Sequence, residues 1–289
     1  MIEQALYEHL TAQESLYPYL ATYSGRPAIF NQEAPADTDQ FWESGPQYGR
    51  IVFAVDLQGD PERDVAATLA VDILCKKDEQ FPEEIEPIVK DLIDGYFFIG
   101  GSCTMAAQWK NSAPFTEVNG QISGCEVTFD LLALPLQSTG DPDVIARINE
   151  WTGNIPGLHV INYDKLPATA WKPTATESSV YWRLVNDGPA GWIKDRYNTI
   201  WRKAIIKCHI FSADVDKAAA VARDLMVRLY AAKRLMKRGE SPIMVNQKNS
   251  ADYGADPLRT GQVTVEATYG IIVRFMEGGT LENINYPRE

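Results

Sequence analysis

The stretch GRIVFAVDLQGDPERDVAATLAVDIL, residues Gly49–Leu74, reads as a strand, a turn and a helix. Apolar residues alternate with smaller or polar ones over Ile51–Leu57, and this period of two predicts a half-buried β-strand. Asp60 and Pro61 then have the character of a helix N-cap and a first helical residue. The expected helix would bury one alanine-rich face, which includes Val65, Leu69 and Ile73.

A similar phrase returns as WRKAIIKCHIFSADVDKAAAVARDLMVRL, residues Trp201–Leu229. Each phrase follows a helix candidate, Ile2–Gln13 or Asp141–Gly153, and a proline-broken extended stretch that in the first half includes a short strand at Ala28–Asn31. The offset is about 150 residues, one domain length. The order helix–extended–strand–helix–strand therefore predicts an α+β fold of two similar domains, each an antiparallel or mixed sheet packed by helices.

The best boundary between these domains is Pro135–Asp143, rich in turn residues. We expect a first domain over residues 1–138 and a second, a diverged duplicate, over residues 139–289 with a long loop or hairpin arm at about 182–201. Within the first domain, the acidic segment after Cys75 is expected to form a loop and a short helix ending at Gly95. Two strands, YFFIGGSCTMAAQW and GCEVTFDLLALPL, should flank a turn over Lys110–Ser123.

The overall charge excludes some partners. The chain has 289 residues and a net charge of −12, whereas general nucleic-acid binders place Lys and Arg on phosphates. The same charge disfavours docking on anionic lipid. The N-terminal MIEQALYEHLTAQ lacks the basic region of a signal peptide, and no apolar run reaches the ~18 residues of a membrane span. We therefore expect no membrane partner.

No constellation of reactive groups is visible. His9, His159 and His209 have no His, Cys or carboxylate partner at metal-ligand spacing, and no nucleophile elbow or phosphate-binding loop is present. We expect no catalytic, metal-binding or cofactor-binding residue, no cofactor, and no enzymatic activity. The four cysteines, expected to be structural thiols in a reducing compartment, are Cys75, Cys103, Cys125 and Cys208.

Aromatic and basic residues of the second half are the candidates for protein interfaces. Five of the seven tryptophans lie between Trp151 and Trp201, partly in loop-like sequence, and Trp and Tyr are favoured interface anchors. They could equally cap the second core. A basic cluster near Gly239 could complement a helix C-terminus or an acidic patch of another subunit. The interface candidates are Trp182, Trp192, Tyr197, Trp201, Arg234, Lys237 and Arg238.

The order of elements resembles the tail-terminator (tail-completion) proteins of long-tailed bacteriophages. The resemblance rests on the helix Ile2–Gln13, the stretch GRPAIFNQEAPADTD, the strand and helix in RIVFAVDLQGDPERDVAATLAVDIL, and the closing strand CEVTFDLLALP. It spans Met1 to about Leu136 and, more weakly, Asp141–Met276. Members commonly have one such domain, so either both halves form the ring or one decorates it.

The resemblance implies a virion protein at the head–tail junction, assembled in the host cytoplasm. It implies a homo-oligomeric ring, usually a hexamer, that caps the tail tube protein, stops its polymerisation and contacts a head-completion, neck or connector protein. DNA would pass through the lumen without specific binding, and an acidic wall would suit that passage. Two alternatives stay open: another structural component of a tail, neck or baseplate, and an enzyme whose site is not recognisable from motifs.

Overall fold

The chain folds into two separate units of the expected α+β class. The computed structural model describes residues 2–43, 47–57, 65–100, 103–117, 120–191, 199–235, 242–254 and 261–272. The first unit comprises Met1–Pro135 together with Leu166–Lys172, and the second comprises Leu136–Lys165 and Pro173–Glu289. The division thus differs from residues 1–138 and 139–289 in two places: residues 136–138 belong to the second unit, and Leu166–Lys172 belongs to the first.

The first unit is built on a six-stranded sheet with the order β3-β4-β5-β8-β7-β6. β3 is parallel to β4, and all other neighbours are antiparallel. The strands are β3 (Ile29–Asn31), β4 (Arg50–Leu57), β5 (Val65–Lys76), β6 (Phe97–Gly100), β7 (Cys103–Thr116) and β8 (Ile122–Pro135). A short hairpin, β1 (Thr22–Tyr23) with β2 (Arg26–Pro27), follows the 3-10 turn η1 (Tyr17–Tyr19).

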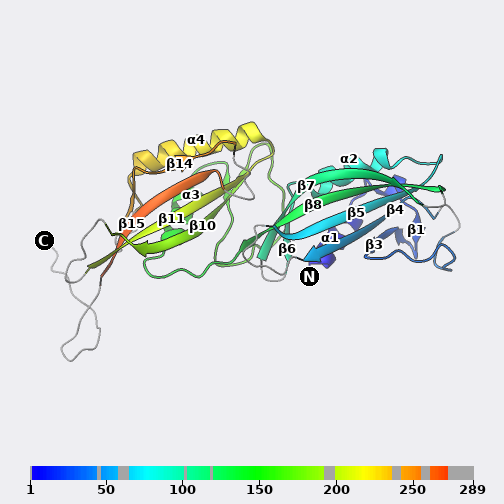
Figure 1. Ribbon diagram of the computed structural model, residues 1–289, viewed down its shortest axis with the longest axis horizontal. Helices are drawn as coiled ribbons and strands as arrows, with labels where there is room; N and C mark the ends of the chain where they lie inside the picture. The colour runs from blue at the N-terminus through cyan, green and yellow to red at the C-terminus, as the bar shows by residue number, and fades with distance from the viewer. Residues whose placement is uncertain are drawn as a thin grey trace, which may run out of the picture. The chain divides into compact units, whose positions relative to one another are not determined.

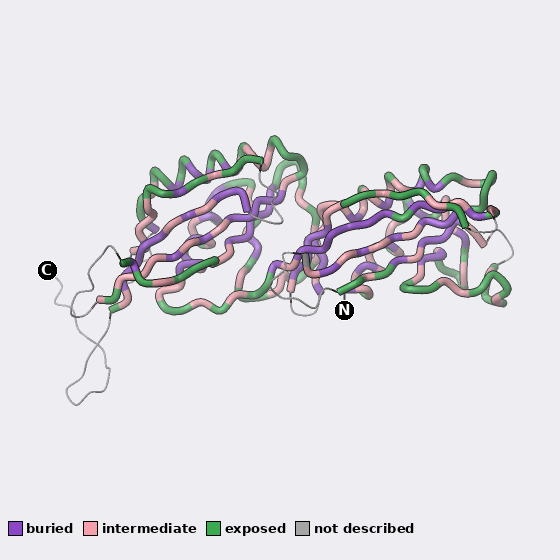
Figure 2. The backbone as a smooth tube through the Cα atoms, viewed as in Figure 1, coloured by how far each residue is buried: buried purple, intermediate pink, exposed green. Residues whose placement is uncertain are grey.

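Two helices, α1 (Ile2–Thr11) and α2 (Pro82–Ile93), cover one face of this sheet. Each buries a single stripe: Leu6 and Leu10 of α1, and Ile85 and Val89 of α2, are fully enclosed. Alternate residues of the central strands meet them, so the purple buried path in Figure 2 follows β5 and β8. In the described part of this unit no helix packs on the opposite face, which is nevertheless partly covered, since Phe97, Ala106 and Leu132 on that face are buried.

The second unit has a seven-stranded sheet with the path β12-β13-β15-β11-β10-β9, and β14 pairs with β15 beside this path. The strands are β9 (Leu158–Val160), β10 (Ser178–Pro189), β11 (Thr199–Phe211), β12 (Arg234–Leu235), β13 (Ile243–Val245), β14 (Ser250–Ala251) and β15 (Val263–Ile272). The helices α3 (Val144–Gly153) and α4 (Val215–Ala232) pack on one face, and α4 runs along the sheet in Figure 1. Asp143 and Asp214 cap them by accepting backbone N–H bonds.

The two sheets have the same topology. Read from the other edge, the second path is β9-β10-β11-β15-β13-β12, which matches β3-β4-β5-β8-β7-β6 strand for strand. The parallel pair is conserved at the same place, since β9 is parallel to β10 as β3 is to β4. The helices match too, because α1 and α3 precede the sheets and α2 and α4 follow β5 and β11. Two similar domains, as expected, are therefore present.

The helix expected over Val65–Leu74 is wrong: this segment is the central strand β5. It pairs along most of its length with both β4 and β8, and its alternate side chains from Ala67 to Cys75 are fully buried. Ladder pairing on two sides thus outweighs the helix propensity of its alanines. The expected N-cap, Asp60 with Pro61, lies outside the described residues.

The correspondence between the halves is consequently shifted from the expected one. Gly49–Leu57 does not match Trp201–Phe211; instead β4 matches β10, and β5 matches β11. The counterpart of α4 is α2, which lies in the acidic segment. The expected turn over Lys110–Ser123 is also partly wrong, because β7 extends to Thr116. The helix candidates Ile2–Gln13 and Asp141–Gly153 are confirmed by α1 and α3, although Asp143 and not Asp141 is the cap.

Candidate functional site

Trp182 is not an interface residue of this unit, contrary to expectation. Its side chain on β10 is fully buried in the second core. The indole N–H donates to Thr152 Oγ1 at 3.0 Å, and that hydroxyl donates in turn to the carbonyl oxygen of Ile148 at 2.7 Å. A buried indole needs such an acceptor. The tryptophan therefore joins α3 to the sheet, which is the core-capping alternative.

The other interface candidates divide into described and undescribed positions. Trp201 is half-buried on β11, and Arg234 is exposed on the edge strand β12. Trp192 and Tyr197 lie outside the described residues, as do Lys237 and Arg238. The ends of the expected arm at about 182–201 lie in the antiparallel strands β10 and β11, and residues 192–198 between them lie outside the described residues. Helix α4 ends at Ala232, before the expected stop at Gly239, because Lys233 turns to a φ of 54°.

The cysteines are free thiols with suppressed acidity. Burial, then the carboxylates of α2, raise the pKa of Cys75 to about 12. Burial raises the pKa of Cys208 well above its usual value. A thiol must ionise to act as a nucleophile or metal ligand, so these groups are inert near neutral pH. Among the described residues no group of three or more His, Cys, Asp or Glu side chains could hold a metal ion.

The histidines lie apart: His9 on α1 is partly buried and His209 on β11 is buried, whereas His159 on β9 is exposed. His9 Nε2 lies 3.0 Å from the carbonyl oxygen of Leu92, and its ring lies 3.9 Å from that of Tyr96. Burial lowers the pKa of His9, the hydrogen bond to Leu92 opposes that shift, and Lys172 adds to it. His209 is buried on β11 directly opposite Tyr181, on the face away from Cys208, as the alternation of the strand requires.

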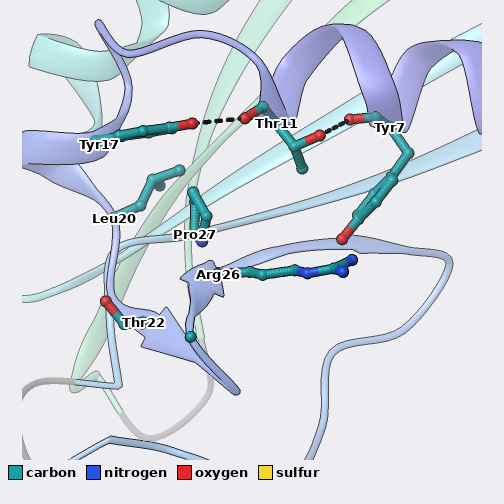
Figure 3. Close-up of a pocket in the computed structure, with 8 residues that line it drawn as sticks. Tyr7, Thr11, Tyr17, Leu20, Thr22, Arg26 and Pro27 are labelled. Carbon is teal, nitrogen blue, oxygen red and sulfur yellow. Dashed lines mark hydrogen bonds between the residues drawn. The ribbon is translucent and has the colours of Figure 1, made fainter.

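Two adjoining hollows lie beside α1 in the first unit. One, of about 490 Å³, is lined by α1, η1 and the β1–β2 hairpin. In Figure 3 the hydroxyl of Tyr7 and the guanidinium of Arg26 point into the same space. Two hydrogen bonds stabilise the wall of this hollow. Tyr17 Oη donates to the carbonyl oxygen of Thr11 at 2.8 Å, and Thr11 Oγ1 donates to the carbonyl oxygen of Tyr7 at 2.7 Å.

The second hollow, of about 660 Å³, shares Tyr7, Arg26 and Pro27 and continues along β3. β3 ends the sheet, so among the described residues its outer side has no strand neighbour. An unpaired strand edge beside tyrosine, arginine and proline has the composition of a protein-interaction groove. The sequence reasoning missed this groove, although the proline-spaced aromatics around Pro18 and Pro27 were a signal for it.

A cluster of rings and charges holds the long loop next to this groove. Tyr23 packs edge-on against Phe30 and Trp42 with ring centroids 5.5 and 5.0 Å away. Arg50, which is buried, donates to Asp37 Oδ1 at 2.9 Å and lies 4.3 Å from the centre of the Tyr48 ring. Burial and then the hydrogen bond to Asp37 raise the pKa of Tyr48 to about 12. These contacts tie the described parts of this loop to β1, β3 and β4.

These features define a class: a two-unit α+β protein whose described surface offers a groove, open strand edges and sheet faces without helices. No helix in the described ranges is long and apolar enough to cross a membrane. Comparisons with models of known families, with curated proteins and with solved structures found no match for the chain.

Proposed function

We propose that this chain is a structural subunit of a bacteriophage tail that assembles into a ring, caps the tail tube, stops its polymerisation and joins the tail to the head or neck. The observation that carries the proposal is the repetition of one sheet topology in both units. A chain with two similar domains presents two similar sets of edges and faces. In a ring of six copies it would supply twelve quasi-equivalent domains, enough to meet different symmetries above and below.

The described surface supports an assembly role. The groove beside β3 and the exposed Arg234 on β12 lie at the edges of the two sheets. Sheet edges and grooves are places where an extended segment of another protein can add by backbone hydrogen bonding. The partners in this proposal are further copies of the chain, the tail tube protein, and a head-completion, neck or connector protein. It assigns no cofactor and no catalytic group.

The net charge of −12 supports passage of DNA without specific binding. An acidic wall repels the phosphate backbone, so DNA could slide through the lumen. In this proposal the protein resides in the virion, at the head–tail junction.

The proposal is tested by adding the purified chain to polymerising tail tube protein. Rings should be visible by negative-stain microscopy and countable by native mass spectrometry, and tubes should end at a bound ring with growth arrested. A chain that stays monomeric at high concentration with tubes present would overturn the ring. A chain that assembles but leaves tube growth unchanged, or binds at the distal end, would favour another tail, neck or baseplate component.

A further inference from the structure

The helix-free face of the first sheet is acidic at its centre. Helices pack on the side of Phe53, Val71 and Val127, so the residues between these positions point to the other side. We call this side of β4, β5 and β8 the acidic face. Its carboxylates that are at least partly exposed are Asp56, Asp72 and Glu126, whereas Asp130 on the same side of β8 is only 4% exposed.

Two of these carboxylates oppose each other directly. Asp72 of β5 is the ladder partner of Glu126 of β8. Like charges at directly opposed positions of a sheet are unfavourable. Burial, and then the charge of Glu126, raise the pKa of Asp72. The folded unit therefore keeps two carboxylates that repel each other, and removing one of them would stabilise an isolated domain.

The nearby cations each pair with a carboxylate other than Asp72 or Glu126. Lys110 Nζ lies 3.1 Å from Asp130 Oδ1, Lys76 pairs with Glu79, and Arg50 pairs with Asp37. Glu126 accepts only a hydroxyl hydrogen bond, from Thr128 at 3.2 Å. In the part of the chain that the structure describes, neither Asp72 nor Glu126 has an ion-pair partner. The repulsion at this point is left uncompensated within the unit.

The equivalent face of the second sheet is basic. Helices pack on the side of Ile206 and Cys208, so Lys203 and Lys207 of β11 point to the helix-free side, as does Arg183 of β10. We call this side of β10, β11 and β15 the basic face. Its carboxylate is Glu266, whose Oε2 lies 3.3 Å from Lys203 Nζ.

A like-charge pair occurs here too, with the opposite sign. Arg183 is the ladder partner of Lys207. The acidic pair thus joins β5 to β8, whereas the basic pair joins β10 to β11, the counterparts of β4 and β5. One face thus carries two opposed negative charges and the other two opposed positive charges, so the charges of the two faces are complementary and attract when the faces meet.

Uncharged side chains lie next to the charges on both faces. On the acidic face Ala54, Ala70 and Thr68 lie between the carboxylates, and on the basic face Ile205 and Thr264 lie between the cations. Ala54 and Glu126 are exposed, and Lys203, Lys207 and Thr264 are partly exposed.

We propose that the acidic face of one copy docks on the basic face of the next copy. The occupant of each face is a second copy because the complementary surface belongs to the same chain. Such head-to-tail contacts are heterologous, and they close into a ring when the rotation between copies permits. The inference rests on the proposed ring and identifies the contact that builds it.

Two charge reversals test the contact, Asp72→Lys and Lys207→Glu. Each replaces a like-charge pair within its unit by an opposite-charge pair, so each should leave the fold intact or more stable. Each should nevertheless raise the concentration for half-assembly by at least about tenfold, because it creates a like-charge contact between copies. The controls make equivalent reversals at exposed positions away from both faces: Glu150→Lys on α3 and Lys248→Glu before β14. Thermal unfolding by circular dichroism checks all four variants.

Mixing the two variants gives the sharper result. Every contact in an alternating ring of Asp72→Lys and Lys207→Glu copies pairs opposite charges again. Native mass spectrometry should therefore show rings in the equimolar mixture at concentrations where neither variant assembles alone. If both variants assemble like the unchanged chain, or if the mixture does not recover, the docking proposal is overturned while the ring itself stands.

Zero-length carbodiimide cross-linking of an equimolar mixture of ¹⁵N-labelled and unlabelled chains locates the contact independently. Cross-links of Lys207 or Lys203 with Asp72 or Glu126 should join heavy and light peptides. Cross-links that join only peptides of the same isotope would place the contact within one chain and overturn the proposal. An unchanged chain that forms no oligomer would overturn the proposed function as well, so the two failures are distinguishable.

Discussion

The indole of Trp171 lies flat on the ring of Phe97, with ring centroids 4.5 Å apart and planes 4° from parallel. Their backbones pair as well: Phe97 N donates to Trp171 O at 2.8 Å, and Trp171 N donates to Phe97 O at 3.3 Å. Trp171 follows α3 in the sequence, yet it extends the first sheet at β6. It therefore covers an edge strand that would otherwise be open to pairing.

Removing this ring should loosen the edge of the first unit. We expect Trp171→Ala to lower the free energy of unfolding of that unit by about 1–2 kcal/mol, from the lost ring pair and the apolar area it covers. Amide hydrogen exchange at Phe97 should speed up, and proteolysis near residue 171 should increase. Lys172→Ala is the control, because it removes only exposed contacts to Asp91 and should cost less than about 0.5 kcal/mol. Equal protection of Phe97 in both variants would contradict the role of the ring.

Trp182 gives the largest expected loss of stability. Trp182→Ala should cost about 3–5 kcal/mol, because it empties a fully buried site in the second core. Thr152→Val keeps the volume but removes the acceptor of the indole N–H, and should cost about 1–3 kcal/mol. Urea denaturation followed by fluorescence measures both. Val185→Ala, at a half-exposed position of the same strand, should be near neutral. If Trp182→Ala left the free energy of unfolding unchanged, Trp182 would again be a candidate for a protein interface.

The class of the fold and the presence of two similar domains could be predicted because the order of elements repeats over the length of a domain. A repeat of this length can be recognised even where individual residues differ. Which strand of one domain corresponds to which strand of the other could not be predicted. Val65, Leu69 and Ile73 recur at helical spacing, and the same segment also alternates through Val71 and Cys75. The choice depended on β8, which lies far along the sequence and pairs with nearly the whole segment.

The candidate site was predicted less well than the fold. Tryptophan composition pointed to interfaces, but whether Trp182 faces outward depends on Thr152 thirty residues away in sequence, which supplies its buried acceptor. The charged faces were equally hidden. Asp72 and Glu126 become neighbours only through strand register, as do Arg183 and Lys207. Counting charges along the sequence gives the net charge of −12, but it does not show that acidic residues gather on one sheet and basic residues on the other.

Asp143 should stabilise the second unit as a helix cap. Its Oδ1 accepts from Ile145 N and Ala146 N, both at 2.9 Å, and its Oδ2 accepts from the hydroxyl of Tyr163. Asp143→Ala should cost about 1–2 kcal/mol in urea denaturation. Asp143→Asn keeps a capping oxygen and should cost markedly less. If the Asn and Ala variants were equally unstable, the loss would arise from the charge and not from the cap.

The opposed pair of Asp72 and Glu126 should be visible in the pH dependence of stability. Burial, then Glu126, raise the pKa of Asp72 in the folded chain above its ordinary value of 3.8, so ionisation is harder in the folded than in the unfolded state. The carboxyl consequently favours folding while it is protonated, and stability falls as pH rises from 3.8 through the raised pKa. We expect Asp72→Asn to raise the melting temperature of the non-assembled chain at pH 7 and to leave it unchanged below the unfolded pKa. Asp56→Asn, which removes one charge at an exposed position of the same face, should give a smaller gain. A melting temperature that Asp72→Asn shifts equally at both pH values would show that volume and hydrogen bonding, rather than charge repulsion, govern this position.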